Sequence, residues 1–130
     1  MMPRFDARNA IAAIEQFHVT HSQWVPTMFS RMLKLNETEQ QRFDLSSHRV
    51  AIHAAAPCPL GVKQKMLEWW GPIIYEFYGG TEGNGLTHVT PENWLAKPGT
   101  VGQAILGELH ICDEEGNELP TGETGLVYFE

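Results

Sequence analysis

Hydrophobic residues in the first part of the chain recur first with the spacing of a helix and then with that of a strand. Between Phe5 and His18 they fall three or four positions apart, which predicts an amphipathic helix with Asp6 as its N-cap. The run from Val19 to Val25 is rich in β-branched and aromatic residues and stops at a proline, so it predicts a strand. The chain therefore opens with a helix followed by a strand.

The same alternation continues as far as Tyr78. The predicted segments are a helix over 26–35, a short helix over 36–43, a strand over 49–55, a helix over 59–70 and a strand over 73–78. Pro26 suits the first turn of a helix, and Asn36 with Glu39 resembles a capping box. This order predicts an α/β fold, in which a parallel sheet with helical crossovers is covered by helices in a doubly wound arrangement.

The pattern changes after Glu108. Two short apolar runs, Leu109 to Cys112 and Leu126 to Phe129, are separated by Asp, Gly, Asn and Pro, which predicts a small antiparallel β unit. We therefore divide the chain into an α/β part over 1–106 and an antiparallel β segment over 107–130 of the same domain. A chain of 130 residues has the usual size of one domain.

Composition and charge exclude several classes of function. A formal net charge of -7 with scattered basic residues offers no surface for a nucleic-acid backbone, so DNA and RNA are not expected partners. Cys58 and Cys112 lack the spacing of a zinc or redox motif and are read as reduced thiols, which favours a cytoplasmic protein. No apolar run approaches about 18 residues, so no transmembrane segment is predicted.

The residues with potential chemistry follow two predicted strands. Ala54, Ala55, Ala56 and Pro57 come after the strand that ends near His53, and a glycine-rich loop over 79–83 comes after the strand that ends near Tyr78. Ligands of α/β sheets bind beyond the carboxyl ends of the strands. If the two strands are neighbours, both loops line one crevice.

The side chains in these loops are of the types that bind a nucleotide. Small residues over 54–57 let a flat ring lie against the backbone, and Tyr78 can stack on its other face. Gly79 and Gly80 allow close approach, the Thr81 hydroxyl can donate to a phosphate, and Glu82 can coordinate Mg²⁺. The alternative is a tight strand exit in which Thr81 and Glu82 only cap a turn.

Five motifs occur in an order found in one known family. They are VPTMF at 25–29, AAAPCP at 54–59, YGGTEG at 78–83, PGTVG at 98–102 and GNELPTGETG at 116–125. The third looks like the Tyr-Gly-x-Thr-Glu motif of the adenylate-forming superfamily, and the set resembles its acyl-CoA synthetases, the fatty-acid–CoA ligases. The likeness spans nearly the whole chain.

The resemblance implies an acid–thiol ligase that uses ATP, Mg²⁺ and coenzyme A. By this likeness a carboxylic acid, of the fatty-acid class, would form an acyl-adenylate and pyrophosphate, and its acyl group would then pass to coenzyme A. Thr81 and Glu82 are the implied catalytic residues, and Glu82 is the implied metal ligand. The implied nucleotide-binding residues are Ala55, Ala56, Pro57, Tyr78, Gly79, Gly80 and Thr81. The implied acyl pocket is His53, Ala54, Gly79 and Gly80.

The chain also departs from the family pattern. His53 and Ala54 stand where the family often has Ser-Gly, and the phosphate loop, the ribose-binding aspartate and the C-terminal domain with its lysine are absent from these 130 residues. The resemblance therefore implies an internal fragment with negligible turnover on its own. The alternative is a non-catalytic α/β nucleotide-binding or interaction module. The acid and the oligomeric state are left open.

Overall fold

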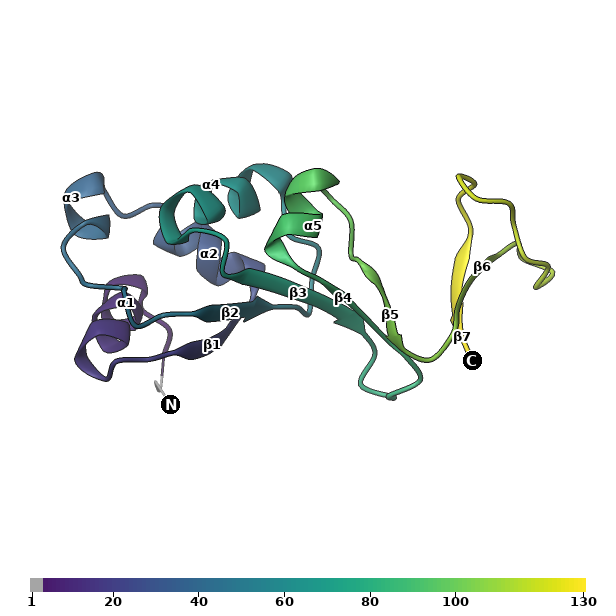
Figure 1. Ribbon diagram of the computed structural model, residues 1–130, viewed down its shortest axis with the longest axis horizontal. Coiled ribbons are helices and arrows are strands. Elements are labelled where there is room, and N and C mark those ends of the chain that lie inside the picture. Colours follow the sequence, from purple (N-terminus) through teal and green to yellow (C-terminus); the bar gives the residue numbers. More distant parts are fainter. Residues whose placement is uncertain (1–3) are drawn as a thin grey trace.

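The computed structural model describes residues 4–130 (Figure 1). Its helices are α1 (Ala7–Gln16), α2 (Pro26–Met32), α3 (Glu37–Gln40), α4 (Leu60–Trp70) and α5 (Pro91–Ala96). Its strands are β1 (His21–Trp24), β2 (Val50–His53), β3 (Ile74–Gly79), β4 (Leu86–Val89), β5 (Gln103–Leu106), β6 (Leu109–Cys112) and β7 (Leu126–Phe129). No helix in this part of the chain is both long enough and apolar enough to cross a membrane.

The main sheet has five strands in the order β1-β2-β3-β4-β5. The pairs β1–β2 and β2–β3 are parallel, which confirms the predicted parallel core, whereas β3–β4 and β4–β5 are antiparallel. The segment β4–α5–β5 was not predicted from the sequence. The sheet is therefore mixed, with an α/β half and an antiparallel edge.

The helices gather on one side of this sheet. Figure 1 shows α2, α4 and α5 above the strands, and α1 packs beside α2. A doubly wound arrangement needs crossovers on both faces, but parallel strands that follow one another in a single direction, joined by crossovers of one hand, place their helices on the same face. The doubly wound expectation is therefore corrected to a sheet with one covered face.

Local signals fix the ends of several helices. The Asp6 carboxylate accepts a hydrogen bond from the Asn9 N–H at 2.9 Å at the start of α1, and Asn36 accepts one from the Glu39 N–H at 3.0 Å at the start of α3. Helix α4 ends at Gly71, whose φ of +79° is a conformation that glycine adopts without strain. These caps agree with the sequence predictions.

The core lies between the helices and the covered face of the sheet. Its buried hydrophobic residues are Ala10, Ile11, Ile14, Trp24, Phe29, Met32, Ala51, Met66, Leu67, Trp70, Ile74, Val89 and Trp94. Four of these carry aromatic rings, and the rings of Trp24, Phe29 and Trp70 contact one another at centroid distances of 5.5 to 6.4 Å. This aromatic cluster joins β1, α2 and α4.

Strands β6 and β7 form a separate antiparallel ribbon, as the sequence predicts. Figure 1 shows it beyond β5, at the end of the molecule that carries the C-terminus. The ribbon is tied to the main sheet near Gly85, where a Cβ would lie 2.0 Å from the Phe129 ring. The chain passes from the main sheet to the ribbon between Leu106 and Leu109.

Candidate functional site

Strands β2 and β3 place the two candidate loops next to each other. The two strands are adjacent and parallel, and His53 lies opposite Glu76 in the register. The segments that follow them therefore leave the sheet at the same end, the carboxyl end of the strands. The segment 54–57 follows β2, and the loop 80–85 follows β3. The two strands are therefore neighbours, which is the condition that the sequence prediction set for a shared crevice.

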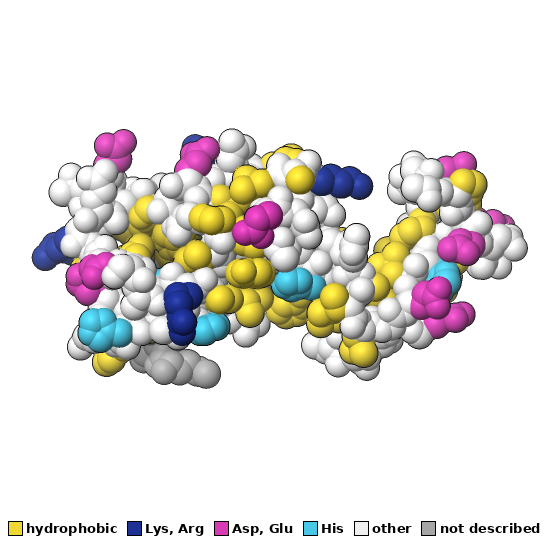
Figure 2. Space-filling view, viewed as in Figure 1, with side chains coloured by type: hydrophobic (Ala, Val, Ile, Leu, Met, Phe, Trp, Pro, Cys, Tyr) yellow, Lys and Arg dark blue, Asp and Glu magenta, His cyan; other side chains and the backbone are white. Residues whose placement is uncertain are grey.

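A cavity of about 560 Å³ lies at this end of the sheet. Its lining residues are Ala55, Ala56, Pro57, Glu76, Phe77, Tyr78, Gly79, Val101, Gly102, Leu109, Ile111 and Val127. The last three come from the ribbon, so the cavity lies between the two sheets. Figure 2 shows a hollow between the ribbon and the body of the molecule, with hydrophobic side chains along the ribbon's side of it.

The predicted site residues divide into three groups in the structure. Five of them line the cavity: Ala55, Ala56, Pro57, Tyr78 and Gly79. Gly80, Thr81 and Glu82 lie in the loop after β3 and are exposed outside that lining. His53 and Ala54 are buried and are not part of the cavity wall.

The loop over 80–85 connects the antiparallel strands β3 and β4, so it is a hairpin loop. The Gly83 N–H donates to the Gly80 carbonyl at 3.2 Å, and Gly83 has a φ of +72°. Glu82 folds back on this turn, since a Cβ at Gly80 would lie 2.5 Å from its Oε2. Its carboxylate has no ion pair among residues 4–130 and stays open to solvent.

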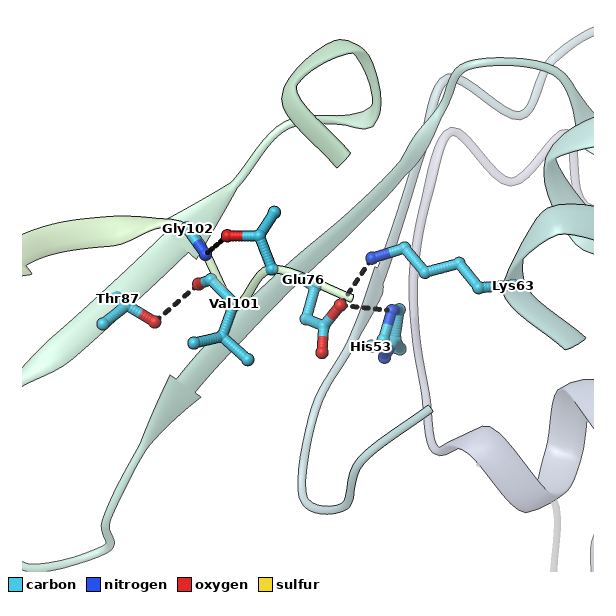
Figure 3. Close-up of polar contacts among 7 residues, drawn as sticks. His53, Lys63, Glu76, Thr87, Val101 and Gly102 are labelled. Carbon is cyan, nitrogen blue, oxygen red and sulfur yellow. Dashed lines mark hydrogen bonds and ion pairs between the residues drawn. The ribbon is translucent and has the colours of Figure 1, made fainter. Parts of the chain in front are cut away.

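Behind the cavity lies a buried polar cluster that consists of His53, Lys63 and Glu76 (Figure 3). The Lys63 Nζ donates to Glu76 Oε2 at 2.5 Å, and His53 Nε2 lies 3.3 Å from the same oxygen. His53 and Lys63 are fully buried, and Glu76 is 7% exposed. Glu76 also lines the cavity, so the cluster contacts the candidate site through this one carboxylate.

Burial and charge act against each other in this cluster. Burial would raise the pKa of Glu76, but the hydrogen bonds and charges of His53 and Lys63 outweigh it and hold the pKa below its usual value. Burial lowers the pKa of Lys63, and the contact with Glu76 opposes that effect. Burial, followed by the Glu76 charge, raises the pKa of the nearby Cys58 thiol to about 11, so this thiol is protonated at neutral pH.

The third wall of the cavity is held by the segment 100–102, between α5 and β5. The Thr87 hydroxyl donates to the Val101 carbonyl at 2.7 Å, and the Gly102 N–H donates to the Thr100 hydroxyl at 3.1 Å (Figure 3). A Cβ at Gly102 would lie only 1.9 Å from the His88 carbonyl oxygen. The PGTVG motif therefore brings the backbone against β4 and holds Val101 at the cavity.

Sequence reasoning missed Glu76, Lys63 and the apolar walls. A signal for the first two was present: Glu76 interrupts the apolar run of β3, and Lys63 lies three and four positions before the buried Met66 and Leu67 on α4. A charged residue on a buried stripe requires a partner, and each is the other's partner. The apolar walls from the ribbon had no local signal, because they depend on how two sheets meet.

Comparison with known proteins agrees with this geometry. A family model described as AMP-binding enzyme matches residues 1–130. Acyl-coenzyme A synthetase ACSM5, mitochondrial, of Homo sapiens is 30% identical over 127 residues, which cover 97% of this chain and 21% of that protein. The chain thus spans about a fifth of the length of this relative.

Solved structures show the same fold. The amide bond synthetase McbA from Marinactinospora thermotolerans superposes with a TM-score of 0.84 at 26% identity, over 97% of this chain and 26% of that one. ATP-bound MatB from Rhodopseudomonas palustris gives a TM-score of 0.81 at 26% identity, over 98% of this chain and 25% of that one. The motifs, the fold and the family match over the whole length agree, and the chain belongs to the AMP-binding enzyme family.

Proposed function

We propose that this chain is part of an acyl-CoA synthetase and carries the wall of the active site that binds the adenine ring and the magnesium-bound phosphates of ATP. The observation that supports it is the cavity between the ends of β2 and β3, lined by residues 55–57 and Tyr78. Its volume of about 560 Å³ lies within the range of roughly 300–1,000 Å³ for small-molecule sites.

The adenine ring would lie between the backbone of 55–57 and the Tyr78 ring. Tyr78 is 46% exposed and lines the cavity, so its face is available for stacking. The other lining residues are mostly apolar, which suits a flat heterocycle. Glu76 is the exception, and its Oε1, which makes no hydrogen bond within residues 4–130, would accept one from the exocyclic amine of adenine.

The phosphates would extend from this cavity toward the hairpin loop over 80–85. The Thr81 hydroxyl is exposed there and would donate to the α-phosphate, and the backbone of Gly79 and Gly80 would border the acyl group. Glu82 offers one free carboxylate, which fits Mg²⁺ because that ion takes one or two carboxylates together with phosphate oxygens and water. When bound, the ion would neutralise phosphate charge.

The reaction would proceed in two balanced steps. A carboxylate oxygen of the acid attacks the α-phosphorus of ATP, the bond to the β-phosphate oxygen breaks, and pyrophosphate leaves. The coenzyme A thiolate then attacks the acyl carbon, and AMP leaves with the electrons of the carbon–oxygen bond. Thr81 would stabilise charge on the α-phosphate in the first step, and Tyr78 would hold the base in place.

We further propose a fatty acid as substrate and the cytoplasm as location. The apolar ribbon side chains at Leu109, Ile111 and Val127 suit an acid with a hydrocarbon chain. Both cysteines are free thiols, in keeping with a reducing compartment. His53 and Ala54 would shape the acyl site only indirectly, from behind the cavity wall.

Binding to the 130-residue chain tests the assigned wall. Titration with ATP should show a Kd that tightens when Mg²⁺ is added, and Glu82→Ala should remove this tightening. Glu114→Ala is the matched control, because Glu114 is also an exposed carboxylate in a turn but lies in the ribbon. Tyr78→Ala should weaken binding with or without the ion. Binding that ignores both Tyr78 and Glu82 would contradict the assignment.

Exchange of labelled pyrophosphate into ATP tests the chemistry in an enzyme that contains this chain. Thr81→Val or Glu82→Ala should lower acid-dependent exchange by about 2 kcal/mol or more, which is typical for the loss of one transition-state donor. Exchange that depends on fatty acids and not on short or aromatic acids would support the proposed substrate. Nucleotide binding without exchange would instead indicate a non-catalytic nucleotide-binding module.

A further inference from the structure

Lys63 is the least expected side chain in the core. It lies on α4 with no exposed surface, and its neighbours on the same buried stripe are Met66, Leu67 and Trp70. Removing a charged ammonium from water costs several kcal/mol, and a buried ion pair rarely recovers more than that cost. A gain in the stability of the fold is therefore a weak explanation for a lysine at this position.

The contacts of Lys63 point to a role at the cavity. Its Nζ lies 5.0 Å from the centre of the Trp94 ring and 2.5 Å from Glu76 Oε2. His53 Nε2 approaches the same oxygen at 3.3 Å. Figure 3 shows the other carboxylate oxygen of Glu76 turned away from both groups.

The two oxygens of Glu76 thus have different surroundings. Oε2 accepts a hydrogen bond from Lys63 on α4 and lies 3.3 Å from His53 Nε2 on β2, whereas Oε1 has no hydrogen-bond partner in the described chain. Cys58, in the segment between β2 and α4, is the remaining titratable group that senses Glu76, and it is a neutral thiol. On the β4 side Glu76 pairs with Val89, which carries no charge. A nine-tenths buried carboxylate therefore offers one free acceptor to the cavity.

We propose that Lys63 is a positioning residue that acts through Glu76: it holds one carboxylate oxygen and so leaves the other as an acceptor for the cavity, where the site selects a base that presents an N–H donor. The inference deepens the proposed function, because it assigns the means by which the cavity distinguishes an amino-purine from an oxo-purine. The His53 ring lies beside the same oxygen, with its Nε2 at 3.3 Å. Neither Lys63 nor His53 lines the cavity.

The first test needs no ligand and measures the protonation of the Glu76 carboxylate directly. In the 130-residue chain labelled with ¹³C-glutamate, the Cδ resonance of Glu76 should titrate with a midpoint below the ordinary value of 4.5. Lys63→Met should raise this midpoint by about one pH unit or more, because a buried carboxylate loses its nearest positive charge. Lys65→Met is the matched control on the same helix, since Lys65 is exposed, and it should leave the midpoint unchanged.

The second test measures the selectivity of the chain between two nucleotides. We compare ATP with inosine triphosphate, which carries a carbonyl in place of the exocyclic amine. The wild-type chain and Lys65→Met should favour ATP by about tenfold, the size expected for a hydrogen bond to a charged group. Lys63→Met should lose this preference at acidic pH, between the wild-type midpoint and its own raised midpoint, where only the wild-type carboxylate is ionised, and should regain it at neutral pH. A purely structural role would weaken both nucleotides alike at every pH.

Two further measurements keep the inference testable if Lys63→Met does not fold. Lys63→Arg preserves the charge and should retain both the low midpoint and the ATP preference. In the wild-type chain, a Glu76 midpoint at or above 4.5 would overturn the inference without any substitution.

If the wild type shows the low midpoint and Lys63→Met raises it, but no nucleotide binds, the positioning role stands and the proposed function fails. Nucleotide binding with a midpoint that Lys63→Met leaves unchanged would overturn the positioning role alone.

Discussion

The five-stranded sheet and the two-stranded ribbon bury their side chains to very different extents. Ala51 and Ile74 in the main sheet have no exposed surface under the helices, whereas Leu126 and Tyr128 in β7 are 49% and 46% exposed. Of the residues in β6 and β7, only Cys112 is buried. Burial of apolar area is the main favourable term in folding, so the stability of the chain is concentrated in the sheet and its helices.

The candidate site lies where these two regions meet. Two walls of the cavity come from the ends of β2 and β3 and from the segment 100–102, and the third comes from the exposed ribbon. Substitutions in the first region should therefore change stability strongly, and substitutions in the ribbon should change the cavity with little cost to folding. Five experiments test this separation, in order of decreasing expected effect.

The largest difference is expected between two aromatic residues. Phe29→Ala removes a fully buried ring from the aromatic cluster and should lower the free energy of unfolding by about 3–5 kcal/mol. Tyr128→Ala removes a half-exposed ring from β7 and should change it by about 0.5 kcal/mol. Urea unfolding followed by tryptophan fluorescence measures both. Equal losses would show that the ribbon carries as much stability as the core.

The ion pairs of the two regions give the next comparison. Lys63→Met leaves the Glu76 carboxylate buried without its partner and should lower the free energy of unfolding by about 3 kcal/mol. The pair His110–Glu118 in the ribbon is 3.3 Å apart, but the Glu118 side chain is 69% exposed, so Glu118→Gln should cost about 0.5 kcal/mol or less.

A double substitution separates charge from packing at the buried pair. Lys63→Met combined with Glu76→Leu removes both charges and should recover most of the loss seen in Lys63→Met alone, because apolar replacements of buried pairs are often neutral. Denaturant midpoints of the two variants measure this recovery. No recovery would mean that the loss comes from packing around Trp94 and not from the unpaired charge.

A comparison of two glycines with positive φ measures the effect of the close contact between Gly102 and β4 separately from the effect of backbone conformation. Gly102 has a φ of +89° and no room for a Cβ, which would lie 1.9 Å from the His88 carbonyl oxygen. Gly122, in the ribbon, has a φ of +100° and nothing within 4 Å. Both alanine variants pay about 1 kcal/mol for the backbone conformation, and Gly102→Ala should lose a further 1–3 kcal/mol from the clash. Thermal unfolding measures the difference, and equal shifts would contradict the close contact.

The helices and strands from α1 to β3 were predictable because their signals are local. Periodic apolar positions and caps at Asp6, Asn36 and Gly71 specify helices without reference to the rest of the chain. The segment β4–α5–β5 was missed although Thr90 and Pro91 form a recognisable helix start, with the Thr90 hydroxyl accepting from the Asn93 N–H at 3.2 Å. Its two strands have four residues each, too few for a clear alternation.

The site was predictable only in part for a similar reason. The loops over 54–57 and 79–83 follow strand ends, which the sequence shows, whereas the hairpin pairing of β3 with β4 depends on contacts between distant residues. The inward direction of Lys63 and Glu76 depends on the same packing, because a charged residue is ordinarily expected at the surface. The cavity wall from the ribbon needs both sheets in place.

The smallest expected effect is a pH dependence that belongs to the main sheet. His48 is buried, its Nε2 lies 2.6 Å from Ser22 Oγ, and the Trp24 Nε1–H donates to that same hydroxyl oxygen. The hydroxyl hydrogen is then free to be donated to a neutral His48. Burial, together with the charge of His21, lowers the pKa of His48 below the ordinary value of 6.5.

The sign of the effect follows from this lowered pKa. The unfolded chain binds a proton at His48 more readily than the folded chain, so stability is complete above pH 6.5 and falls as the pH drops below 6.5 toward the folded pKa. The size of the loss is set by the difference between the pKa values of His48 in the unfolded and folded chain, at about 1.4 kcal/mol for each pKa unit. Urea unfolding between pH 7.5 and pH 5 should therefore show a steeper loss for the wild type than for His48→Gln, which cannot titrate. Equal slopes would show that the imidazole is not held neutral in the folded chain.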